Sequence, residues 1–499
     1  MVTSRGNFSL ALADTAARTP DAPAIVEAGT TTDYAGLASA AGAIAHSLAT
    51  AGLQPGDRVG IFQQRGLHAA ASFFGVMAAG GIAVNVNETL RRRQVDYVLD
   101  HSGARLLLAF PDFVTRSLGS LERDIEIIDP GTAEPSPLQP VARVWADPAH
   151  IIYTSGSTGM PKGVAVSHGN LWAGTESVAE YVELRADDRL ASLLPFSFDY
   201  GLNQLLGAVL TGAALVVDRS PIPQRIVRAL QQQEVTVLAA VAPLWLRLLD
   251  VGGFEDTELP HLRAMTNTGS RLPKEAVSRI RKAHPQTKLF LMYGLTEAFR
   301  STRLDPDLVD SKPESIGRAI PGAQILLVDE DGRSVPDGET GELVHRGPTV
   351  ALGYWADPAA TASRFRPPPA QPDGVPDSER AVFSGDLVRR DADGDLYFVG
   401  RRDGLIKTSG YRVSPDEVAE ALYASGSIAE AVVFGEPDDV LGSRIVAAVV
   451  LRDGSDVEQA WDFVRAELPP YMQPQRIDVR TELPRTASGK FASPTASAT

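Results

Sequence analysis

The chain has 499 residues, of which 44% are hydrophobic and 7% aromatic, so it is long enough for two or three globular domains. Its formal net charge of −15 makes binding to nucleic acid or to an anionic membrane surface unfavourable. The sequence contains no cysteine, which excludes disulfides, thiolate metal sites, iron–sulfur clusters and a cysteine nucleophile.

The N-terminal region lacks the pattern of a secretion signal. Its apolar run is short and is interrupted by Asp14. No segment approaches the ~20 uninterrupted apolar residues that a membrane-spanning helix requires. These features predict a cytoplasmic protein.

Helix-like and strand-like segments alternate through the first 130 residues. Apolar residues recur at helical spacing over 34–53, and a Pro-Gly-Asp turn then leads into the strand-like segment at 58–62. Similar helix-to-strand pairs cover 68–87 and 94–110. This alternation predicts an α/β region with parallel strands. The polar connector at 129–140 predicts a joint between subdomains.

The second half of the chain changes character twice. A further α/β region covers 212–297, and strand-like segments separated by turns follow from about residue 320. The proline-rich segment 364–377 predicts a loop. The predicted fold is therefore α/β, with a large N-terminal domain at 1–400 and a small mobile α+β C-terminal domain at 401–499. The large domain is expected to contain layered α/β subdomains and a small β subdomain.

The segment YTSGSTGMPKGV at 153–164 carries the strongest functional signal. Its glycines and hydroxyl side chains do not build a core, whereas backbone N–H groups, hydroxyls and a lysine form a cradle for phosphate. It is not a Walker loop, because Pro161 precedes Lys162 and Gly163 follows it where Ser or Thr is needed. A solvated turn between two strands is the alternative, but a turn needs only one or two glycines. The pattern favours phosphate binding.

This segment resembles the phosphate loop of the adenylate-forming superfamily, which includes acyl-CoA synthetases, adenylation domains of peptide synthetases, and luciferases. Segments similar to that superfamily also occur in its order along the chain, namely PFSFDYGLNQ at 195–204, YGLTE at 293–297, FSGDLV at 383–388, GRRDG at 400–404 and LPRTASGK at 483–490. The resemblance implies ATP and Mg²⁺ as cofactors. It also implies a reaction in two steps, in which an acyl-adenylate forms and a phosphopantetheine thiol then displaces AMP.

The resemblance also implies a role for each matching residue. An ammonium between the attacking carboxylate and the α-phosphate lowers the barrier, and a carboxylate suits a hard divalent cation. The expected catalytic residues are Lys490, Thr296 and Glu297, and Glu297 is also the expected metal ligand. The expected ATP- or AMP-binding residues are Thr154, Ser155, Gly156, Ser157, Thr158, Gly159, Lys162, Gly269, Ser270, Tyr293, Gly294, Asp386 and Arg401. Asp403 is the expected hinge, and Lys407 and Gly410 are expected on the path of the thiol. His168 matches a family position and is interpreted as structural.

The acid pocket is inferred from the same resemblance. Asp199 stands where peptide-synthetase adenylation domains place an aspartate that pairs with the α-ammonium of an amino acid. A lone carboxylate would repel an acid, so this position favours an amino-acid substrate. The alternative is an Asp that caps the following helix. The other expected substrate-binding residues are Tyr200, Asn203, Thr266, Thr268, Met292, Arg300 and Ser301. Arg300 is interpreted as a partner for a second carboxylate or polar oxygen, or alternatively as half of a surface ion pair.

The predicted function is ATP-dependent activation of a small acid, with an amino acid favoured, and transfer to a phosphopantetheine thiol. The thiol would belong to coenzyme A or to a carrier protein on a separate chain, because no carrier module follows Lys490. The alternative is an acyl-CoA ligase for a non-amino small or aryl acid. Similarity to stand-alone ligases suggests secondary metabolism. A silent binding homologue is disfavoured, because it would be expected to have lost some of the residues Lys162, Glu297, Asp386, Arg401 and Lys490.

Overall fold

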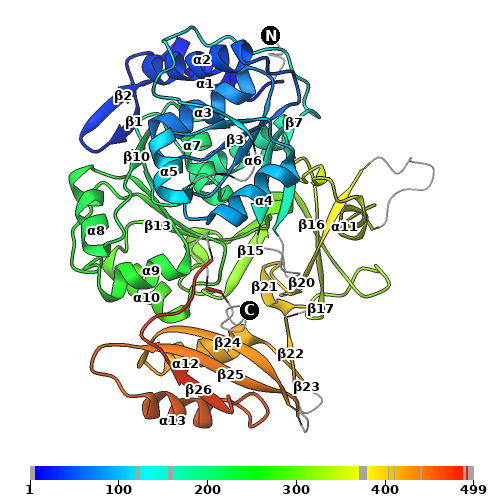
Figure 1. The fold of residues 1–499 in the computed structure, drawn as a ribbon. Coiled ribbons are helices and arrows are strands. Elements are labelled where there is room, and N and C mark those ends of the chain that lie inside the picture. Colours follow the sequence, from blue (N-terminus) through cyan, green and yellow to red (C-terminus); the bar gives the residue numbers. More distant parts are fainter. Residues whose placement is uncertain are drawn as a thin grey trace.

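Two large sheets and a small C-terminal sheet organise the chain (Figure 1). The computed structural model describes residues 6–119, 121, 124–154, 161–369, 379–402, 404–408, 411–438, 441–486 and 491–492. Among these residues, no helix has both the length and the apolar character needed to cross a bilayer.

The first large sheet has the strand order β18-β8-β7-β4-β3-β5-β6. Its strands are β3 (Arg58–Ile61), β4 (Ile82–Asn85), β5 (Leu106–Leu108), β6 (Glu126–Ile128), β7 (Pro148–Thr154), β8 (Lys162–Ser167) and β18 (Gly353–Tyr354). From β7 to β6 all neighbours are parallel, as the alternation of helices and strands predicts. β8 and β18 add an antiparallel edge.

The connector at 129–140 leads from β6 to β7 within this sheet, so the predicted joint between subdomains is wrong. The segment crosses helix α2 (Tyr34–Thr50) at close range, where a Cβ on Gly42 would lie 2.1 Å from the backbone oxygen of Ser136. Its prolines and polar residues predict an irregular segment. They do not reveal which strands it connects.

The second large sheet combines a parallel and an antiparallel half, in the order β16-β17-β20-β21-β15-β14-β13-β12-β11-β9-β10-β1-β2. The first half contains β1 (Pro23–Glu27), β2 (Thr30–Asp33), β9 (Arg189–Ser192), β10 (Ala214–Val217), β11 (Val237–Ala240), β12 (Ala264–Asn267) and β13 (Lys288–Tyr293). The second half contains β14 (Thr302–Arg303), β15 (Ser315–Ala319), β16 (Gln324–Val328), β17 (Thr340–Arg346), β20 (Ala381–Arg390) and β21 (Leu396–Arg401), with β19 (Phe365–Arg366) paired to β20.

Two strand pairings in this sheet differ from the regions that the sequence pattern predicts. β1 pairs with β10, so the first 130 residues contribute to both large sheets and not to one α/β region. The β-rich segment after residue 320 is hydrogen-bonded to the parallel half, because β14 pairs with both β13 and β15. Both differences arise from pairings between distant segments, which local patterns do not encode.

Helices α6 (His168–Val182) and α7 (Asp199–Thr211) pack against each other between the two large sheets. A capping box begins α6, in which Ser167 Oγ accepts from Asn170 N at 3.1 Å and Asn170 Oδ1 accepts from Ser167 N at 2.9 Å. Leu171 of α6 and Leu205 of α7 belong to one buried hydrophobic cluster that includes strands of both sheets. The two sheets are therefore held around a shared core. The remaining helices of the N-terminal part are α1 (Leu10–Arg18), α3 (Leu67–Ala78), α4 (Arg92–Ser102), α5 (Pro111–Leu118), α8 (Pro223–Gln232), α9 (Ala242–Asp250), α10 (Lys274–Ala283) and α11 (Pro358–Arg364).

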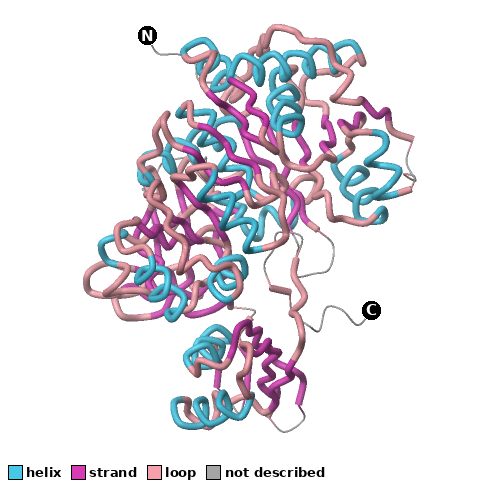
Figure 2. Tube along the Cα trace, turned by 90° about the vertical axis from the view of Figure 1, so that its left-hand side faces the viewer, coloured by secondary structure: helices cyan, strands magenta, loops and turns pink. Residues whose placement is uncertain are grey.

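The small C-terminal unit lies beneath the larger body in Figures 1 and 2. It consists of the hairpin β22 (Ile406–Thr408) and β23 (Tyr411–Val413), helix α12 (Pro415–Ala424), strands β24 (Ile428–Asp438) and β25 (Gly442–Leu451), helix α13 (Val457–Glu467) and strand β26 (Arg476–Val479). The predicted large and small domains are thus present.

Ion pairs and apolar contacts dock this unit against α9 and α10. Arg452 donates from Nη1 and Nη2 to the two carboxylate oxygens of Glu275, both at 2.8 Å. Lys274 N donates to Glu420 Oε1 at 3.0 Å. Leu422 of the small unit and Trp245 of α9 belong to the same buried hydrophobic cluster.

Candidate active site

The predicted phosphate loop connects the two strands of an antiparallel hairpin. Thr154 ends β7, Lys162 begins β8, and the two residues are register partners. The loop residues between them, Ser155, Gly156, Ser157, Thr158 and Gly159, lie outside the described residues. The described residues therefore fix only the two ends of the loop, at Thr154 and Lys162.

Contacts on both flanks fix the base of this hairpin. His101 Nδ1 lies 2.8 Å from Tyr153 Oη, and Tyr97 Oη donates to the backbone oxygen of Pro161 at 3.0 Å. Trp355 N donates to Gly163 O at 2.7 Å. The base of this hairpin is thus held by α4 and by the segment that follows β18.

Tyr354 contacts both Glu297, the expected metal ligand, and Lys162, an expected phosphate-binding residue. Its Oη donates to Glu297 Oε1 at 2.5 Å, and Lys162 Nζ lies 5.2 Å from the centre of its ring. Burial and the neighbouring Glu297 carboxylate raise the pKa of Tyr354, so its hydroxyl stays a donor. Sequence reasoning missed this residue. Glu297 lies in the short 3-10 helix η1 (Thr296–Ala298) directly after the β13 strand end.

A second polar cluster joins three of the predicted nucleotide-binding residues. Tyr293 Oη donates to Asp386 Oδ2 at 2.5 Å, and Arg401 Nη1 lies 3.6 Å from Asp386 Oδ1. Asp386 and Arg401 face each other as register partners on β20 and β21. Burial raises the pKa of Asp386, and Arg401 and Tyr293 oppose that shift. Asp386 Oδ1 is buried and accepts no hydrogen bond from the described residues, which leaves it open to a hydroxyl donor of a ligand.

The turns after β12 and β13 lie at the same edge of the sheet, because these neighbouring strands are parallel. Gly269 has a φ of 87°, which favours glycine, and Asn267 Nδ2 donates to the backbone oxygen of the next predicted residue, Ser270, at 3.0 Å. A Cβ on Gly294 would lie 2.9 Å from Arg300 Cα, so that turn also requires close backbone approach. Met292 Sδ receives a hydrogen bond from a tyrosine of α6 at 2.9 Å.

Four of the predicted acid-pocket residues, Asp199, Tyr200, Thr266 and Arg300, meet at the start of α7. Asp199 is the first residue of that helix, and its Oδ1 accepts from Tyr200 N at 2.8 Å. Its Oδ2 lies 3.5 Å from Arg300 Nη1, and both side chains are buried. Tyr200 Oη lies 2.5 Å from Thr266 Oγ1. Arg300 is thus half of a buried ion pair and not of a surface pair.

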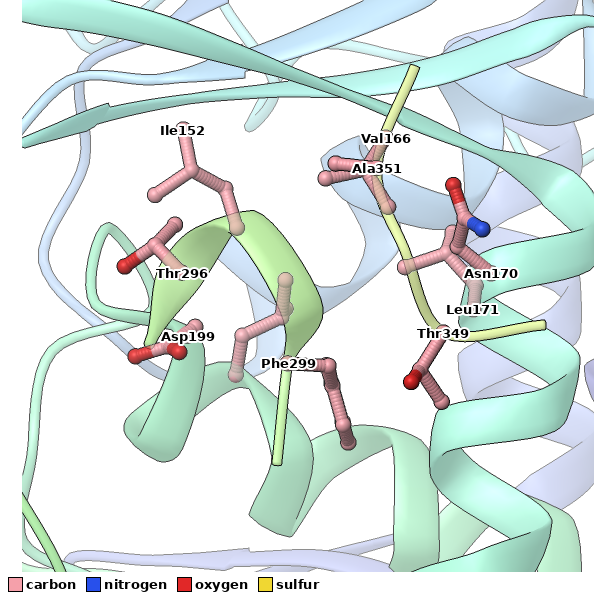
Figure 3. Close-up of a pocket in the computed structure, with 10 residues that line it drawn as sticks. Ile152, Val166, Asn170, Leu171, Asp199, Thr296, Phe299, Thr349 and Ala351 are labelled. Atoms are coloured by element: carbon pink, nitrogen blue, oxygen red, sulfur yellow. The ribbon is translucent and has the colours of Figure 1, made fainter. Parts of the chain in front are cut away.

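Asp199, an expected acid-pocket residue, and Thr296, the expected α-phosphate contact, line the same small enclosed cavity (Figure 3). The space open to the centre of a water molecule is about 10 Å³, which is room for about one water. Its lining is Ile152, Val166, Asn170, Leu171, Asp199, Leu202, Thr296, Phe299, Thr349 and Ala351. Strands β7 and β8 of the first large sheet, both central helices and the segments that follow β13 and β17 therefore surround it.

His345 is a further residue that sequence reasoning did not select. Its Nδ1 lies 2.9 Å from Ser301 Oγ, and its Nε2 lies 2.9 Å from Oγ1 of Thr349 in the cavity wall. Burial lowers its pKa to about 4, so the ring is neutral at pH 7. His168 has the structural role expected of it, because its Nδ1 accepts from Phe8 N at 3.1 Å.

The remaining predicted residues fall on or beside undescribed segments. Lys490, Asp403 and Gly410 lie outside the described residues, and the side chain of Lys407 on β22 is also outside them.

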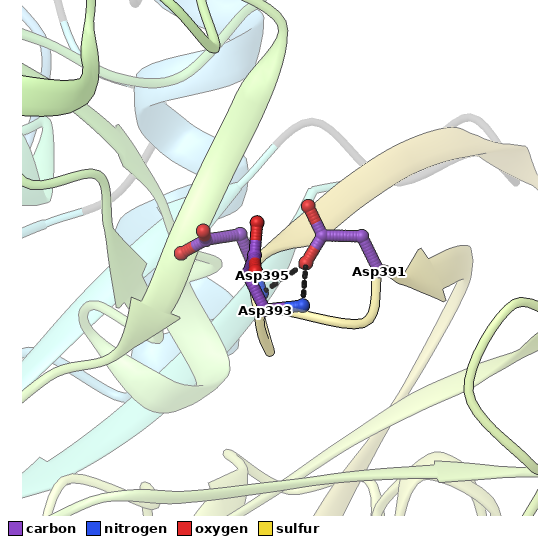
Figure 4. A group of neighbouring side chains, drawn as sticks. All are labelled: Asp391, Asp393 and Asp395. Carbon is purple, nitrogen blue, oxygen red and sulfur yellow. Dashed lines mark hydrogen bonds between the residues drawn. The ribbon is translucent and has the colours of Figure 1, made fainter.

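A group of three aspartates in the turn between β20 and β21, Asp391, Asp393 and Asp395, has the spacing of a cation site (Figure 4). Lys312 Nζ donates to all three carboxylates, at distances of 2.9, 2.8 and 2.7 Å. Arg318 Nε adds a bond to Asp395 Oδ1 at 2.9 Å. The lysine ammonium thus occupies the position between the three carboxylates and anchors the hairpin to the segment before β15.

Two segments of the chain match known families. Residues 12–355 match the family described as AMP-binding enzyme, and residues 417–490 match the AMP-binding enzyme C-terminal domain. The chain is 32% identical over 502 residues to a syringomycin synthase of Pseudomonas syringae pv. syringae, covering 96% of this chain and 79% of that protein. It is 29% identical over 528 residues to a long-chain-fatty-acid–CoA ligase of Bacillus subtilis (strain 168), covering 96% of this chain and 92% of that protein.

One solved structure has a similar fold over nearly the whole chain, in agreement with these family matches. It is o-succinylbenzoate coenzyme A synthetase from Bacillus subtilis in complex with ATP and a magnesium ion, with a TM-score of 0.84, 26% identity, and coverage of 97% of this chain and 98% of that one. The chain spans only 6% to 13% of the length of four further relatives, which include linear gramicidin and plipastatin synthases and match it with 30% to 33% identity. The resemblance and the fold class expected from the sequence are confirmed, and the chain belongs to the adenylate-forming superfamily of AMP-binding enzymes.

Proposed function

We propose that this protein uses MgATP to convert a small polar carboxylic acid to its acyl-adenylate and then transfers the acyl group to a phosphopantetheine thiol. The observation that carries this proposal is the shared cavity, because Thr296 of the YGLTE segment and Asp199 of α7 line the same enclosed space. An acid bound next to these two residues would have its carboxyl group beside the expected α-phosphate position. Proximity and neutralisation of charge supply most of the rate in such a reaction.

The described residues suit the nucleotide. Asp386 Oδ1 has a free acceptor position for a ribose hydroxyl, and Arg401 beside it supplies a cation for phosphate. Glu297 offers a carboxylate oxygen, held by Tyr354, to a divalent cation, which when bound would neutralise charge on the phosphates. Tyr293, the last residue of β13, donates to Asp386 and would lie against the adenine.

The two domains would divide the reaction between them. Residues 1–400 would bind ATP and the acid, and residues 401–499 would bring Lys490 to the reacting groups in the first step. Rotation at Asp403 would then present Lys407 and Gly410 to the thiol path. The chemistry of the first step needs one ammonium at the site where both the carboxylate and the α-phosphate carry negative charge.

Two classes of acid are candidates. An amino acid, which the sequence favours, would place its ammonium at Asp199. Arg300 Nη1 already lies 3.5 Å from the Asp199 carboxylate, however, so an ammonium would have to share that carboxylate or displace a buried guanidinium. This ion pair favours the second candidate, an acid without an α-ammonium. The acceptor is coenzyme A in that case, and a separate carrier protein if an amino acid is the substrate.

Acid-dependent exchange of pyrophosphate into ATP tests the first step. We expect Lys490→Ala to slow this exchange at least a hundredfold, about 2.7 kcal/mol of barrier, and to leave thioester formation from supplied acyl-adenylate within a few-fold of wild type. Lys282→Ala, on the exposed face of α10, is the control and should change neither rate. A near-normal exchange rate in Lys490→Ala would remove this lysine from the mechanism. Failure of any acid to drive exchange in the wild type would overturn the proposed function.

Matched pairs of acids separate the two classes. Alanine against propionate, and phenylalanine against 3-phenylpropionate, differ only in the α-ammonium. We expect the amine-free member of each pair to be used at least as well, and coenzyme A to accept the acyl group. A strong preference for the amino acids, lost in Asp199→Asn, would instead establish the ammonium pairing that the sequence favours.

A further inference from the structure

Arg300 is buried in a way that leaves half of its guanidinium without a partner. The side chain is 2% exposed, its Nη1 donates to Phe299 O at 2.6 Å, and the same nitrogen faces Asp199. Nε and Nη2 are buried with no hydrogen-bond partner among the described residues. Burying a cation with unpaired donors is costly, and the cost is recovered when a ligand accepts from them.

The backbone also departs from its relaxed geometry to bury this side chain. Phe299, the preceding residue, has a φ of 62°, which is uncommon for a residue with a Cβ. Its ring lies against Gly174 of α6, where a Cβ would approach within 2.6 Å of the ring. The turn that carries Arg300 is therefore held by tight packing, and the guanidinium is fixed over the ring of Tyr200, with Cζ 4.8 Å from the ring centre.

The two unpaired nitrogens share one edge of the planar group. In an arginine, Nε–H and one N–H of Nη2 point in parallel, and this fork matches the two oxygens of a carboxylate. A hydroxyl or a carbonyl oxygen would occupy only part of such a fork. An ammonium would not accept from it at all.

Neighbouring residues also offer unpaired groups to an acceptor. Asn203 Nδ2 and Thr268 Oγ1 are buried without a partner among the described residues. Asn203 lies four residues after Asp199 on the same face of α7. Thr268 directly follows β12, two residues beyond Thr266, whose hydroxyl contacts Tyr200. Both side chains belong to the expected substrate-binding residues, and each has a donor without a partner among the described residues.

We propose that the substrate is a small dicarboxylic acid, whose second carboxylate is bound by the Nε–Nη2 edge of Arg300 with Asn203 and Thr268 as additional donors. The other carboxyl group would be the one adenylated beside Thr296. Arg300 is then the residue that determines which acid is used. This inference rests on the proposed function, because it identifies the substrate class of the same site.

The test compares acids that differ only at the distal end. Succinate against butanoate, glutarate against pentanoate, and isophthalate against 3-methylbenzoate each exchange a carboxylate for a methyl group. We expect the dicarboxylate to have at least tenfold higher kcat/KM in pyrophosphate exchange in the pair that fits the pocket. Arg300→Gln should lower kcat/KM for that dicarboxylate at least a hundredfold and for its methyl partner less than threefold.

Arg281→Gln is the matched control, because Arg281 lies on α10, pairs with Asp310 at 3.0 Å and contacts none of these groups in the described part of the chain. It should leave both acids within twofold of wild type. The melting temperature and AMP affinity of Arg300→Gln check that the variant is folded, and the wild-type comparison of acid pairs needs no variant.

The two possible failures can be distinguished. Equal or better use of the methyl acids by the wild type, or an unchanged ratio in Arg300→Gln, would overturn the dicarboxylate inference while acid-dependent exchange still supports the proposed function. Absence of exchange with every acid of either class would remove the proposed function, and this inference with it.

Discussion

Tyr354 lies between two parts of the proposed nucleotide site that are far apart in sequence. Its hydroxyl donates to Glu297, and Lys162 lies over its ring. Replacement by phenylalanine keeps the ring and removes only the bond to the carboxylate. Because partners of a metal ligand fix its orientation, we expect Tyr354→Phe to raise the Mg²⁺ concentration for half-maximal exchange roughly tenfold. Titration of Mg²⁺ at saturating ATP measures this shift.

Tyr397→Phe provides the matched control for that substitution. Tyr397 Oη also donates to a carboxylate, that of Asp391 at 3.1 Å, but in the aspartate turn bound by Lys312. Its Mg²⁺ titration should match that of the wild type. If both variants shift alike, or if Tyr354→Phe does not shift, the orienting role of Tyr354 is wrong.

Arg300 illustrates at the residue scale what the sequence does and does not predict. Its place in the acid pocket followed from its distance after the YGLTE segment. Its partner did not, because Asp199 lies a hundred residues earlier on another element, and ion pairs of that kind depend on tertiary packing. Asp386 and Arg401 are a similar case, since their contact follows from the register of β20 and β21.

At the scale of elements, hydrophobic periodicity predicted the segments well and their pairing poorly. The strand at 58–62 and the helix at 34–53 appear as β3 and α2 within a few residues. The pairing of β1 with β10 and the return of the connector to β7 could not be predicted, because both join segments that are distant in sequence. Polar composition identifies a connector but contains no information on which sheet receives it.

Three elements of the large domain each bury a neutral imidazole, and this makes stability depend on pH. Burial lowers the pKa of His150 on β7 to about 3 and the pKa of His345 on β17 to about 4. Burial, together with the nearby Arg143, lowers the pKa of His168 on α6 to about 4. In the unfolded chain these groups titrate near 6.5. Below that pH the unfolded chain binds more protons, so the free energy of unfolding falls as pH drops from about 6.5 toward about 4.

Each of these imidazoles should lower the free energy of unfolding by about 1.4 kcal/mol per pH unit in that window. We expect the urea midpoint at pH 5.5 to lie clearly below that at pH 7.5, and His345→Gln to reduce this difference measurably. His261→Gln is the control, because His261 is exposed and its Nε2 lies 3.8 Å from Glu234. An unchanged pH dependence in His345→Gln would mean that His345 does not titrate as its burial implies.

At the scale of the whole molecule, the proposed two-step reaction requires the small domain to change its position. In the structure it is docked by the bidentate pair of Arg452 with Glu275 of α10 and by the bond from Lys274 N to Glu420. Both pairs lie near solvent, so each contributes on the order of 1 kcal/mol or less. These polar contacts are weak enough to break during turnover, and the apolar contacts with α9 would be exposed when the unit moves.

The absence of cysteine in the sequence makes this movement directly testable. Cysteines at Glu275 and Arg452, joined by a short bismaleimide, would hold the domains as docked. We expect the crosslinked protein to keep one of the two steps, pyrophosphate exchange or transfer from supplied acyl-adenylate, and to lose overall thioester formation at least tenfold. The same crosslink between Arg281→Cys and Asp310→Cys, an ion pair within the large domain, should leave both steps intact. Full overall turnover in the interdomain crosslink would show that a single arrangement carries out both steps, and the rotation at Asp403 would then have no role.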